Sequence, residues 1–212
     1  MRVSYLQNKP FSQACENNKV PILSVIQPLL ASSKGVLEIG SGTGQHAVYF
    51  AKQLPHLIWQ TSDREENHAG IMLWLQDGGL KNLRPPVILD VCQRDWPDVE
   101  VDAVFTANTA HIMHWHEVEE LFKGVSGLLP EGGIFVLYGP VNYNYRYTSE
   151  SNARFDAMLK NRDPESGIRN FEDLDRLATD SGMKLKDDFS MPANNRIICW
   201  VKEREASVSS LK

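Results

Sequence analysis

The sequence has few cysteines and no long apolar run, and both absences narrow the class of protein. Its three cysteines, Cys15, Cys92 and Cys199, are widely spaced and odd in number, unlike the close pairs of disulfide frameworks and zinc sites. No stretch of about eighteen apolar residues occurs, and no basic segment at the start leads into an apolar one. Neither export nor membrane insertion is indicated, and we expect a cytoplasmic protein.

Basic residues are also scarce. The 212 residues include 22 Lys and Arg against 27 Asp and Glu, a net charge of −5, without a run of basic residues. Proteins that bind nucleic acids neutralise phosphates with basic surfaces, so we expect no nucleic-acid partner. The hydrophobic share of 42% is ordinary for a soluble domain. We predict one domain over residues 1–202 and a polar tail over 203–212, and the oligomeric state stays open.

Apolar runs and helical spacings alternate along the chain. Strands are predicted over residues 35–39, 57–62, 87–89, 101–106 and 134–138, followed by 184–190 and 196–202. Helices are predicted over 21–30, 45–54, 65–76, 118–129, 149–159 and 171–181, with Pro28 expected to kink or divide the first. The last two strands flank a turn at 192–195, which indicates an antiparallel hairpin. This pattern predicts a Rossmann-like α/β fold with a seven-stranded, mostly parallel sheet and helices on both faces.

A glycine-rich loop follows the first predicted strand. In Gly40-Ser41-Gly42-Thr43-Gly44, the absent Cβ atoms let backbone amides approach a ligand at the carboxyl end of the sheet. A glycine turn without a ligand is the alternative. Asp63 lies about twenty residues on, at the end of the second strand, where a carboxylate accepts the hydroxyls of a ribose. An aspartate that caps the following helix would explain Asp63 equally simply.

The charge of the loop discriminates between adenosine cofactors. Glu38 would place a carboxylate beside a cationic ligand, whereas it would repel a pyrophosphate. The dinucleotide pattern also requires Gly or Ala where Gln45 stands. Asp90 closes the third strand, where it can accept a hydrogen bond from the adenine amine, with Val91 beside the ring. These residues favour S-adenosylmethionine over a nicotinamide dinucleotide.

Residues 36–44 resemble motif I of the class I S-adenosylmethionine-dependent methyltransferases, and Asp63 and Asp90 are similar to the later acidic positions of that superfamily. The terminal antiparallel hairpin is typical of the same proteins. The resemblance implies a Rossmann-like methyltransferase fold that binds S-adenosylmethionine.

Except for its tail, the chain also resembles the methyltransferase-like 26 family, catalogued too as domain of unknown function 938. The segments that carry this resemblance are Glu16-Asn17-Asn18-Lys19, Tyr138-Gly139-Pro140, Thr148-Ser149, Ser151-Asn152, Phe155-Asp156, Arg162-Asp163-Pro164, Gly167-Ile168-Arg169 and 191–195. The family implies no catalytic residue and no acceptor, and contact of Asn17 with the methionine end of the cofactor rests on the resemblance alone. Asn108-Thr109-Ala110-His111 and 143–147 depart from the family pattern near the expected acceptor pocket.

Methyl transfer depends largely on alignment of the acceptor, so a dedicated catalytic motif is not required. Asn108 follows the fourth strand, where groups face the transferred methyl. Three histidines come next, His111, His114 and His116. Histidine is suited to deprotonating an acceptor at neutral pH, and His111 is the candidate base. Packing or capping histidines are the alternative, and no cysteine or carboxylate nearby in the sequence completes a metal site.

Tyrosines follow the fifth predicted strand. Tyr138 and Tyr143, with two more to position 147, are expected in a loop that covers the pocket, although an exposed flexible loop is equally consistent with them. The candidate cofactor residues are Asn17, Glu38, Gly40, Ser41, Gly42, Thr43, Gly44, Asp63, Asp90, Val91 and Asn108, and the candidate substrate residues are His114, Tyr138 and Tyr143. The sequence predicts a methyltransferase for a small-molecule acceptor. A catalytically silent relative and a nicotinamide-dependent oxidoreductase are the alternatives.

Overall fold

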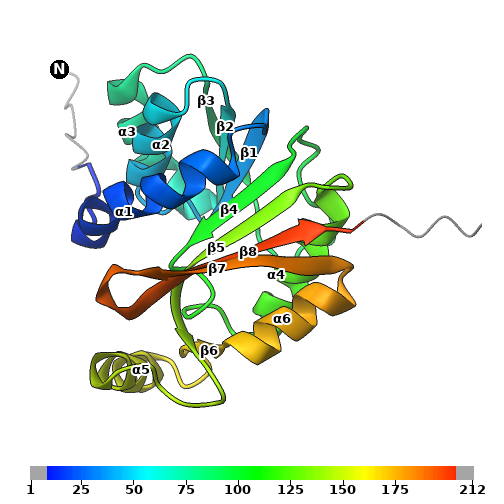
Figure 1. Cartoon of the computed structure of the whole chain (residues 1–212). Coiled ribbons are helices and arrows are strands. Elements are labelled where there is room, and N and C mark those ends of the chain that lie inside the picture. The colour runs from blue at the N-terminus through cyan, green and yellow to red at the C-terminus, as the bar shows by residue number, and fades with distance from the viewer. Residues whose placement is uncertain (1–8, 204–212) are drawn as a thin grey trace, which may run out of the picture.

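The computed structural model describes residues 9–203, and one twisted mixed β-sheet runs through their centre (Figure 1). The strands along the sheet, in spatial order, are β3 (Leu83–Ile88), β2 (Ile58–Asp63), β1 (Gly35–Ile39), β4 (Ala103–Ala107), β5 (Ile134–Asn142), β8 (Asn195–Lys202) and β7 (Met183–Met191). The first five are parallel, and β8 and β7 form an antiparallel pair at the edge. This arrangement confirms the predicted fold class.

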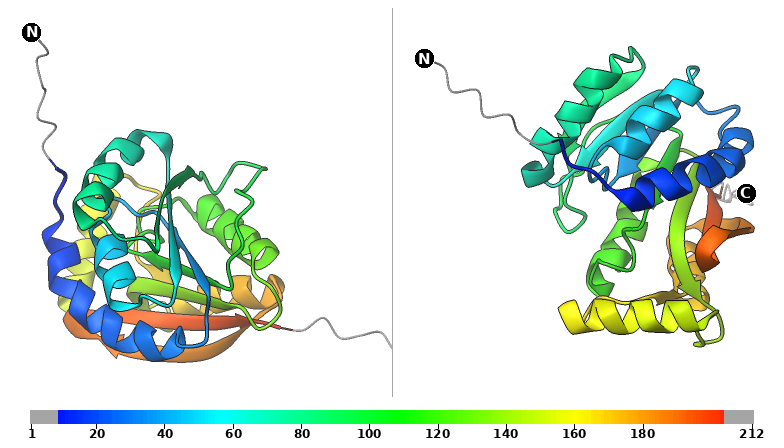
Figure 2. Two further views of the ribbon diagram at one scale, coloured as in Figure 1. Left: turned by 90° about the horizontal axis from the view of Figure 1, so that it is seen from above. Right: turned by 90° about the vertical axis from the view of Figure 1, so that its left-hand side faces the viewer.

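Helices cover both faces of the sheet. The helices are α1 (Gln13–Leu29), α2 (Gln45–Gln53), α3 (His68–Gly78), α4 (Trp115–Leu128), α5 (Glu150–Arg162) and α6 (Phe171–Asp180), with short 3-10 turns η1 (Glu65–Asn67) and η2 (Pro192–Asn194). Helices α1 to α3 pack on one face and α4 and α6 on the other (Figure 2). Helix α5 lies apart from both layers (Figure 1). None of the helices described is both long and apolar enough to cross a bilayer.

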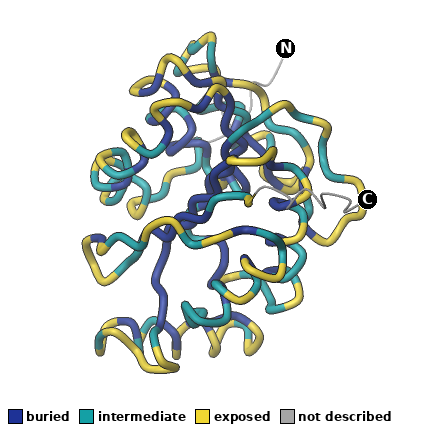
Figure 3. Tube along the Cα trace, turned by 45° about the vertical axis from the view of Figure 1, so that its right-hand side comes forward, coloured by how far each residue is buried: buried dark blue, intermediate teal, exposed yellow. Residues whose placement is uncertain are grey.

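Two apolar cores lie between the helices and the sheet. Trp59, Phe50 and Phe105 are fully buried on the side of α1 to α3, and Trp200 and Phe122 are fully buried on the side of α4 and α6. The central strands are dark along their length in Figure 3 because both of their faces are covered. Strands enclosed in this way need nearly continuous apolar residues, which is the pattern that made them predictable.

Helix α1 begins eight residues before the predicted start at Pro21. The Ser12 side chain caps the helix by accepting a hydrogen bond from the backbone N–H of Cys15. Pro28 was predicted to kink or divide the helix, and it does not divide it, since Pro21 and Pro28 both lie within the one helix. A proline removes one backbone donor, but the fully buried Ile22 and Ile26 hold the helix against the sheet.

Strand β5 continues four residues beyond Tyr138, where the predicted strand ended. All nine of its residues are buried, and its carboxyl end also pairs with β6 (Arg169–Asn170), a two-residue strand that was not predicted. Tyr138 therefore lies in the strand and not in the loop expected after it, because pairing with β8 and β6 continues the strand to Asn142. Of the predicted tail at 203–212, residues 204–212 lie outside the described part.

Candidate functional site

Two cavities lie at the carboxyl edge of the parallel strands. The first, of about 500 Å³, is bounded by the ends of β1, β2 and β4, the segment after β3, and the start of α4. The predicted residues that line it are Gly40, Gly42, Asp63, Asp90, Val91, Asn108 and His114. The wall carries five carboxylates, from Asp63, Glu66, Asp90, Glu117 and Asp163, and one guanidinium, from Arg64. The first cavity is therefore strongly acidic.

Each of the three glycines of the loop is required, or allowed, for a different structural reason. All have a positive φ, of 72° at Gly40, 57° at Gly42 and 87° at Gly44. A Cβ on Gly40 would lie 2.6 Å from the Thr109 methyl carbon, and one on Gly44 would press on the α3 backbone at Ile71. A Cβ on Gly42 would meet only the Gly40 oxygen, at 4.0 Å. Gly40 and Gly44 thus permit close packing, and Gly42 forms a bare edge of the first cavity.

Asp63 ends β2 and holds the loop in place. One carboxylate oxygen accepts the backbone N–H of Gly42 at 2.7 Å. The other accepts the backbone N–H of Arg64 at 2.8 Å and the side-chain amide of Asn67 at 2.7 Å. Asp63 is 8% exposed and lines the first cavity. It does not cap the following helix, since η1 and α3 have Arg64 and Asn67 at their N-caps and no side-chain cap.

Glu38 was expected to contact the cationic ligand, but the structure places it elsewhere. Its side chain is buried and lines neither cavity. It accepts hydrogen bonds from the Ser41 hydroxyl at 2.9 Å and the Trp59 indole at 3.2 Å. Burial raises the pKa of Glu38 to about 7, and the negative charge of Asp63 adds to the rise. The two hydrogen bonds act in the opposite direction, because they stabilise the carboxylate. Glu38 supports the glycine loop from behind.

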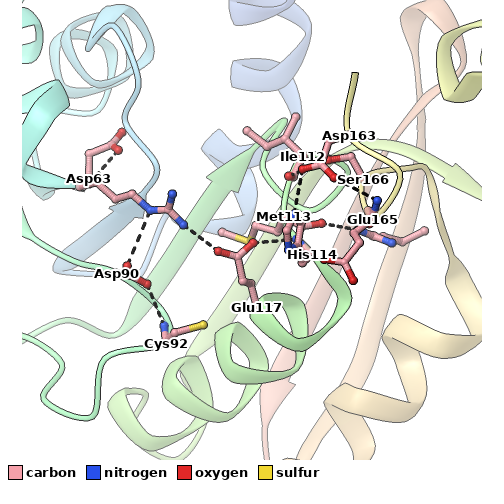
Figure 4. A network of polar contacts seen from close by, with 12 residues as sticks. Asp63, Asp90, Cys92, Ile112, Met113, His114, Glu117, Asp163, Glu165 and Ser166 are labelled. Atoms are coloured by element: carbon pink, nitrogen blue, oxygen red, sulfur yellow. Dashed lines mark hydrogen bonds and ion pairs between the residues drawn. The ribbon is translucent and has the colours of Figure 1, made fainter. Parts of the chain in front are cut away.

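Arg64 lines the first cavity and contacts both Asp90, after β3, and Glu117, in α4. Its guanidinium lies 3.8 Å from an Asp90 oxygen and donates to Glu117 at 2.7 Å. The other Asp90 oxygen accepts the backbone N–H of Cys92 at 3.0 Å. Figure 4 shows this chain of contacts reaching from Asp63 to Glu117. The end of β2 is thereby tied to the first turn of α4.

His114 lies at the rim of the first cavity, where the sequence predicted a substrate residue. Its Nε2 is 2.8 Å from Asp163 and its Nδ1 is 2.8 Å from Glu165 (Figure 4). The hydrogen bond to Asp163 raises the pKa of His114. Its backbone N–H donates to Glu117 at 2.7 Å. His114 thus joins α4 to the segment after α5.

The second cavity, of about 420 Å³, adjoins the first. It lies between α1, the end of β5, α5 and η2, and Asn108 lines both cavities. Asn108 has a φ of 61°, and its backbone N–H donates to the backbone carbonyl oxygen of Tyr138 at 2.9 Å. Within residues 9–203 no Asp, Glu, Lys or Arg lines the second cavity. The two cavities therefore contrast sharply in charge.

His111 and Tyr138 meet in the second cavity. His111 is 7% exposed, and Phe155 of α5 packs against its ring edge to face, with the ring centroids 5.3 Å apart. Burial and the positive charge of Arg169 lower the pKa of His111 to about 4. Within the described part of the chain, hydrogen bonds engage the rings of other histidines, such as His46 and His114, but not that of His111. Its neutral ring therefore faces the cavity without a partner.

The remaining predicted residues lie in different parts of the structure. Asn17 lies in the second cavity rather than the first. Ser41 and Thr43 are bonded within the loop region, to Glu38 and Gln45. Tyr143 lies in neither cavity, because its ring stacks on Phe171 and its hydroxyl donates to Asp188 at 2.6 Å. Tyr143 was predicted to contact the substrate from a loop that covers the pocket. Its side chain instead packs against Phe171 and lines neither cavity.

Several lining residues were missed. Arg64, Glu117, Asn152 and Phe155 line the cavities, and the last two come from α5, whose periodicity predicts a helix but not its position. Arg64 directly follows Asp63 and was the easiest to find. In residues 9–203, no group of three or more His, Cys, Asp or Glu side chains could hold a metal ion.

Three methyltransferases are among the solved structures with a similar fold. An O-methyltransferase family protein from Burkholderia thailandensis matches with a TM-score of 0.79 at 15% identity, over 91% of this chain and 58% of that one. Human N-acetylserotonin methyltransferase in complex with SAM matches at 0.76 and 14% identity, over 90% and 53%. An O-methyltransferase family 2 protein from Planctomyces limnophilus in complex with apigenin matches at 0.72 and 18% identity, over 82% and 52%.

This chain spans little more than half the length of those structures, and at such identities the likeness establishes the fold alone. A family model described as "Protein of unknown function (DUF938)" matches residues 9–202, nearly the whole of the described chain. The protein belongs to the DUF938 family.

Proposed function

We propose that this chain is an S-adenosylmethionine-dependent methyltransferase that acts on a small-molecule acceptor in the cytoplasm, as a member of the methyltransferase-like 26 family. The observation that carries the proposal is the pair of adjoining cavities that share Asn108, one acidic and one uncharged. A transfer between two bound molecules needs two such adjoining sites. The solved methyltransferases of the same fold support the proposal.

The first cavity suits an adenosyl sulfonium. In this proposal Asp63 accepts the ribose hydroxyls and Asp90 and Val91 contact the adenine. The support is that all three residues line the first cavity and that Gly42 leaves a bare backbone edge there. The five carboxylates outweigh the one guanidinium, so a cationic ligand is attracted and a pyrophosphate is repelled. This charge argues against a nicotinamide dinucleotide.

S-adenosylmethionine supplies a methyl group on a sulfonium leaving group, so the protein need not activate the methyl carbon. The chain has to orient the acceptor and take up its proton. Asn108 lies where the cavities meet, and His111 and Tyr138 face the second one. The neutral ring of His111 can accept a hydrogen bond from the acceptor hydroxyl and take its proton as the methyl transfers, and the pKa of about 4 makes His111 a weaker base than a free histidine. Much of the rate then comes from alignment of the two bound molecules.

The test is calorimetry with S-adenosylmethionine and S-adenosylhomocysteine. We expect micromolar binding of both, and at least about tenfold weaker binding in Asp63→Ala, since an interaction worth about 1.4 kcal/mol changes affinity tenfold. Asp77→Ala is the matched control, because Asp77 is an exposed aspartate of α3 that pairs with Lys9 outside both cavities. Absence of binding by the unmodified protein, or a thermal shift with NAD alone, would overturn the proposal.

A further inference from the structure

The second cavity has a wall of unusual composition for a site beside so acidic a neighbour. Its polar groups in residues 9–203 are amides, hydroxyls and one imidazole, without a carboxylate, ammonium or guanidinium. The amides include Asn17 and Asn18 of α1 and Asn152 of α5, and Phe155 with prolines of three segments supplies apolar surface. Such a wall can hydrogen bond a ligand but cannot neutralise a charge on it.

The imidazole does not change this conclusion. Burial and Arg169 keep His111 neutral, with a pKa of about 4. The Arg169 guanidinium is itself committed to the backbone, since it donates to the carbonyl oxygens of Ala110 and Glu165, each at 3.0 Å. An anion in the second cavity would therefore gain no counter-charge from either residue. A charge moved from water into such a site without a partner is strongly disfavoured.

Some hydrogen-bonding capacity remains free for a ligand. The Asn152 amide nitrogen donates to Thr148 and to the Asn194 oxygen, which leaves its carbonyl oxygen as an acceptor on a side chain that is 5% exposed. The ring of His111 likewise has no hydrogen bond within the described residues; the residue is 7% exposed, and Phe155 packs on the ring in a T-shaped contact. Two acceptors beside an aromatic face suit a hydroxyl group on a flat ring better than a thiol, which is a weak donor.

From this wall we infer that the second cavity selects an acceptor that is uncharged and carries its hydroxyl group on an apolar ring. This inference rests on the proposed function and adds the class of substrate to it. Carboxylated, phosphorylated and ammonium-bearing acceptors are excluded by the absence of a counter-charge. His111, Phe155 and Asn152 are the residues that decide this selectivity.

The experiment measures binding, with the protein saturated with S-adenosylhomocysteine. The probes are 4-hydroxybenzamide, 4-hydroxybenzoate and 4-hydroxybenzylamine, with their 3-hydroxy isomers, which share a phenol ring and differ in charge. We expect a neutral member to bind at least about tenfold more tightly than its charged counterparts, because only they lose hydration of a charge. Equal or tighter binding of a charged member, or no binding by any member, would overturn the inference.

A negative charge introduced into the wall tests whether the second cavity is the source of the selectivity for uncharged ligands. Asn17→Asp is nearly isosteric, and its oxygen still accepts the Gln13 amide hydrogen bond. This variant should bring the affinity for 4-hydroxybenzylamine up to that for 4-hydroxybenzamide. Gln27→Glu, the same amide-to-acid change on an exposed part of α1, should leave the order of affinities unaltered. A change in Gln27→Glu alone would contradict the inference, and calorimetry of S-adenosylhomocysteine tests the proposed function separately.

Discussion

The backbone N–H of Gly42 donates a 2.7 Å hydrogen bond to the Asp63 carboxylate, which ties the glycine loop after β1 to the end of β2. The two residues lie on one wall of the acidic cavity. The protein's own hydrogen bond thus holds the loop in the shape that lines the cavity. Preorganisation of this kind reduces the free-energy cost of binding.

Asp63→Asn is expected to weaken both the fold and the cofactor site. Three donors point at the carboxylate, from Gly42, Arg64 and Asn67, and an amide NH₂ in its place opposes at least one of them. Leaving a buried donor unsatisfied costs about 1–3 kcal/mol. Thermal unfolding and calorimetry with S-adenosylhomocysteine measure the two effects. A variant with unchanged stability would show that these hydrogen bonds are dispensable.

Gly40→Ala should destabilise the protein more than Gly42→Ala. Both positions have a positive φ, which costs a residue with a Cβ about 1–2 kcal/mol. Only the Gly40 variant adds a clash, at 2.6 Å from the Thr109 methyl carbon. Thr109→Ser removes that methyl and keeps the hydroxyl that bonds Thr106 at 2.6 Å. The double variant Gly40→Ala, Thr109→Ser should recover part of the lost stability in denaturant unfolding, and no recovery would rule out this contact as the cause.

Glu38→Gln should remove the contribution of this carboxyl group to the pH dependence of stability. The folded-state pKa of Glu38 is raised from 4.5 to about 7 by burial. The folded state then binds the extra proton, so its contribution is full below pH 4.5 and is lost as the pH rises through 7. The loss amounts to about 3 kcal/mol at most. From pH 4.5 to 8.5 the melting temperature of the unmodified protein should fall relative to that of the variant, because the two proteins share every other titrating group, and parallel curves would be evidence against the raised pKa.

Asp163→Asn should lower the pKa of His114. The hydrogen bond from Nε2 to Asp163 is the main cause of the raised value, and Glu165 stands at the other ring nitrogen. Removing the carboxylate charge leaves one negative partner instead of two. A proton NMR titration of the His114 ring measures the change, with Asp77→Asn as the control that should leave the titration unmoved. An unchanged midpoint in Asp163→Asn would contradict the pairing.

Asp156→Ala should loosen α5 over the second cavity. The Asp156 carboxylate accepts the Ile168 N–H at 2.6 Å and the Tyr147 hydroxyl at 2.7 Å, and it pairs with Lys160 at 2.7 Å. The side chain is 1% exposed, so its removal strands a buried donor at a cost of about 1–3 kcal/mol. Hydrogen exchange should speed up in residues 150–170. Tyr147→Phe removes one of the three contacts and should have a smaller effect, and an equal effect would argue against Asp156 as the anchor.

Much of the fold was predictable because its signals are local. The apolar runs of β1, β4 and β5, enclosed on both faces, differ from the helical spacing of α4 within a few residues of sequence. The glycine loop and Asp63 were placed in one wall by spacing alone, since parallel strands end at the same edge of a sheet. The start of α1 was missed because Pro21 was predicted to be the first residue of the helix, whereas the helix is capped by Ser12 and continues through Pro21.

The sequence by itself determined the alternation of strands and helices, the glycine loop, and the acidic ends of β2 and β3. Only the tertiary structure decided that Glu38 turns toward Trp59 behind the loop, that Asn17 and His111 share the second cavity, and that α5 brings Phe155 to it. The reason is physical. Spacing along the chain sets which edge of a sheet a residue occupies, whereas the direction of a side chain and the docking of a distant helix depend on packing against neighbours far away in sequence.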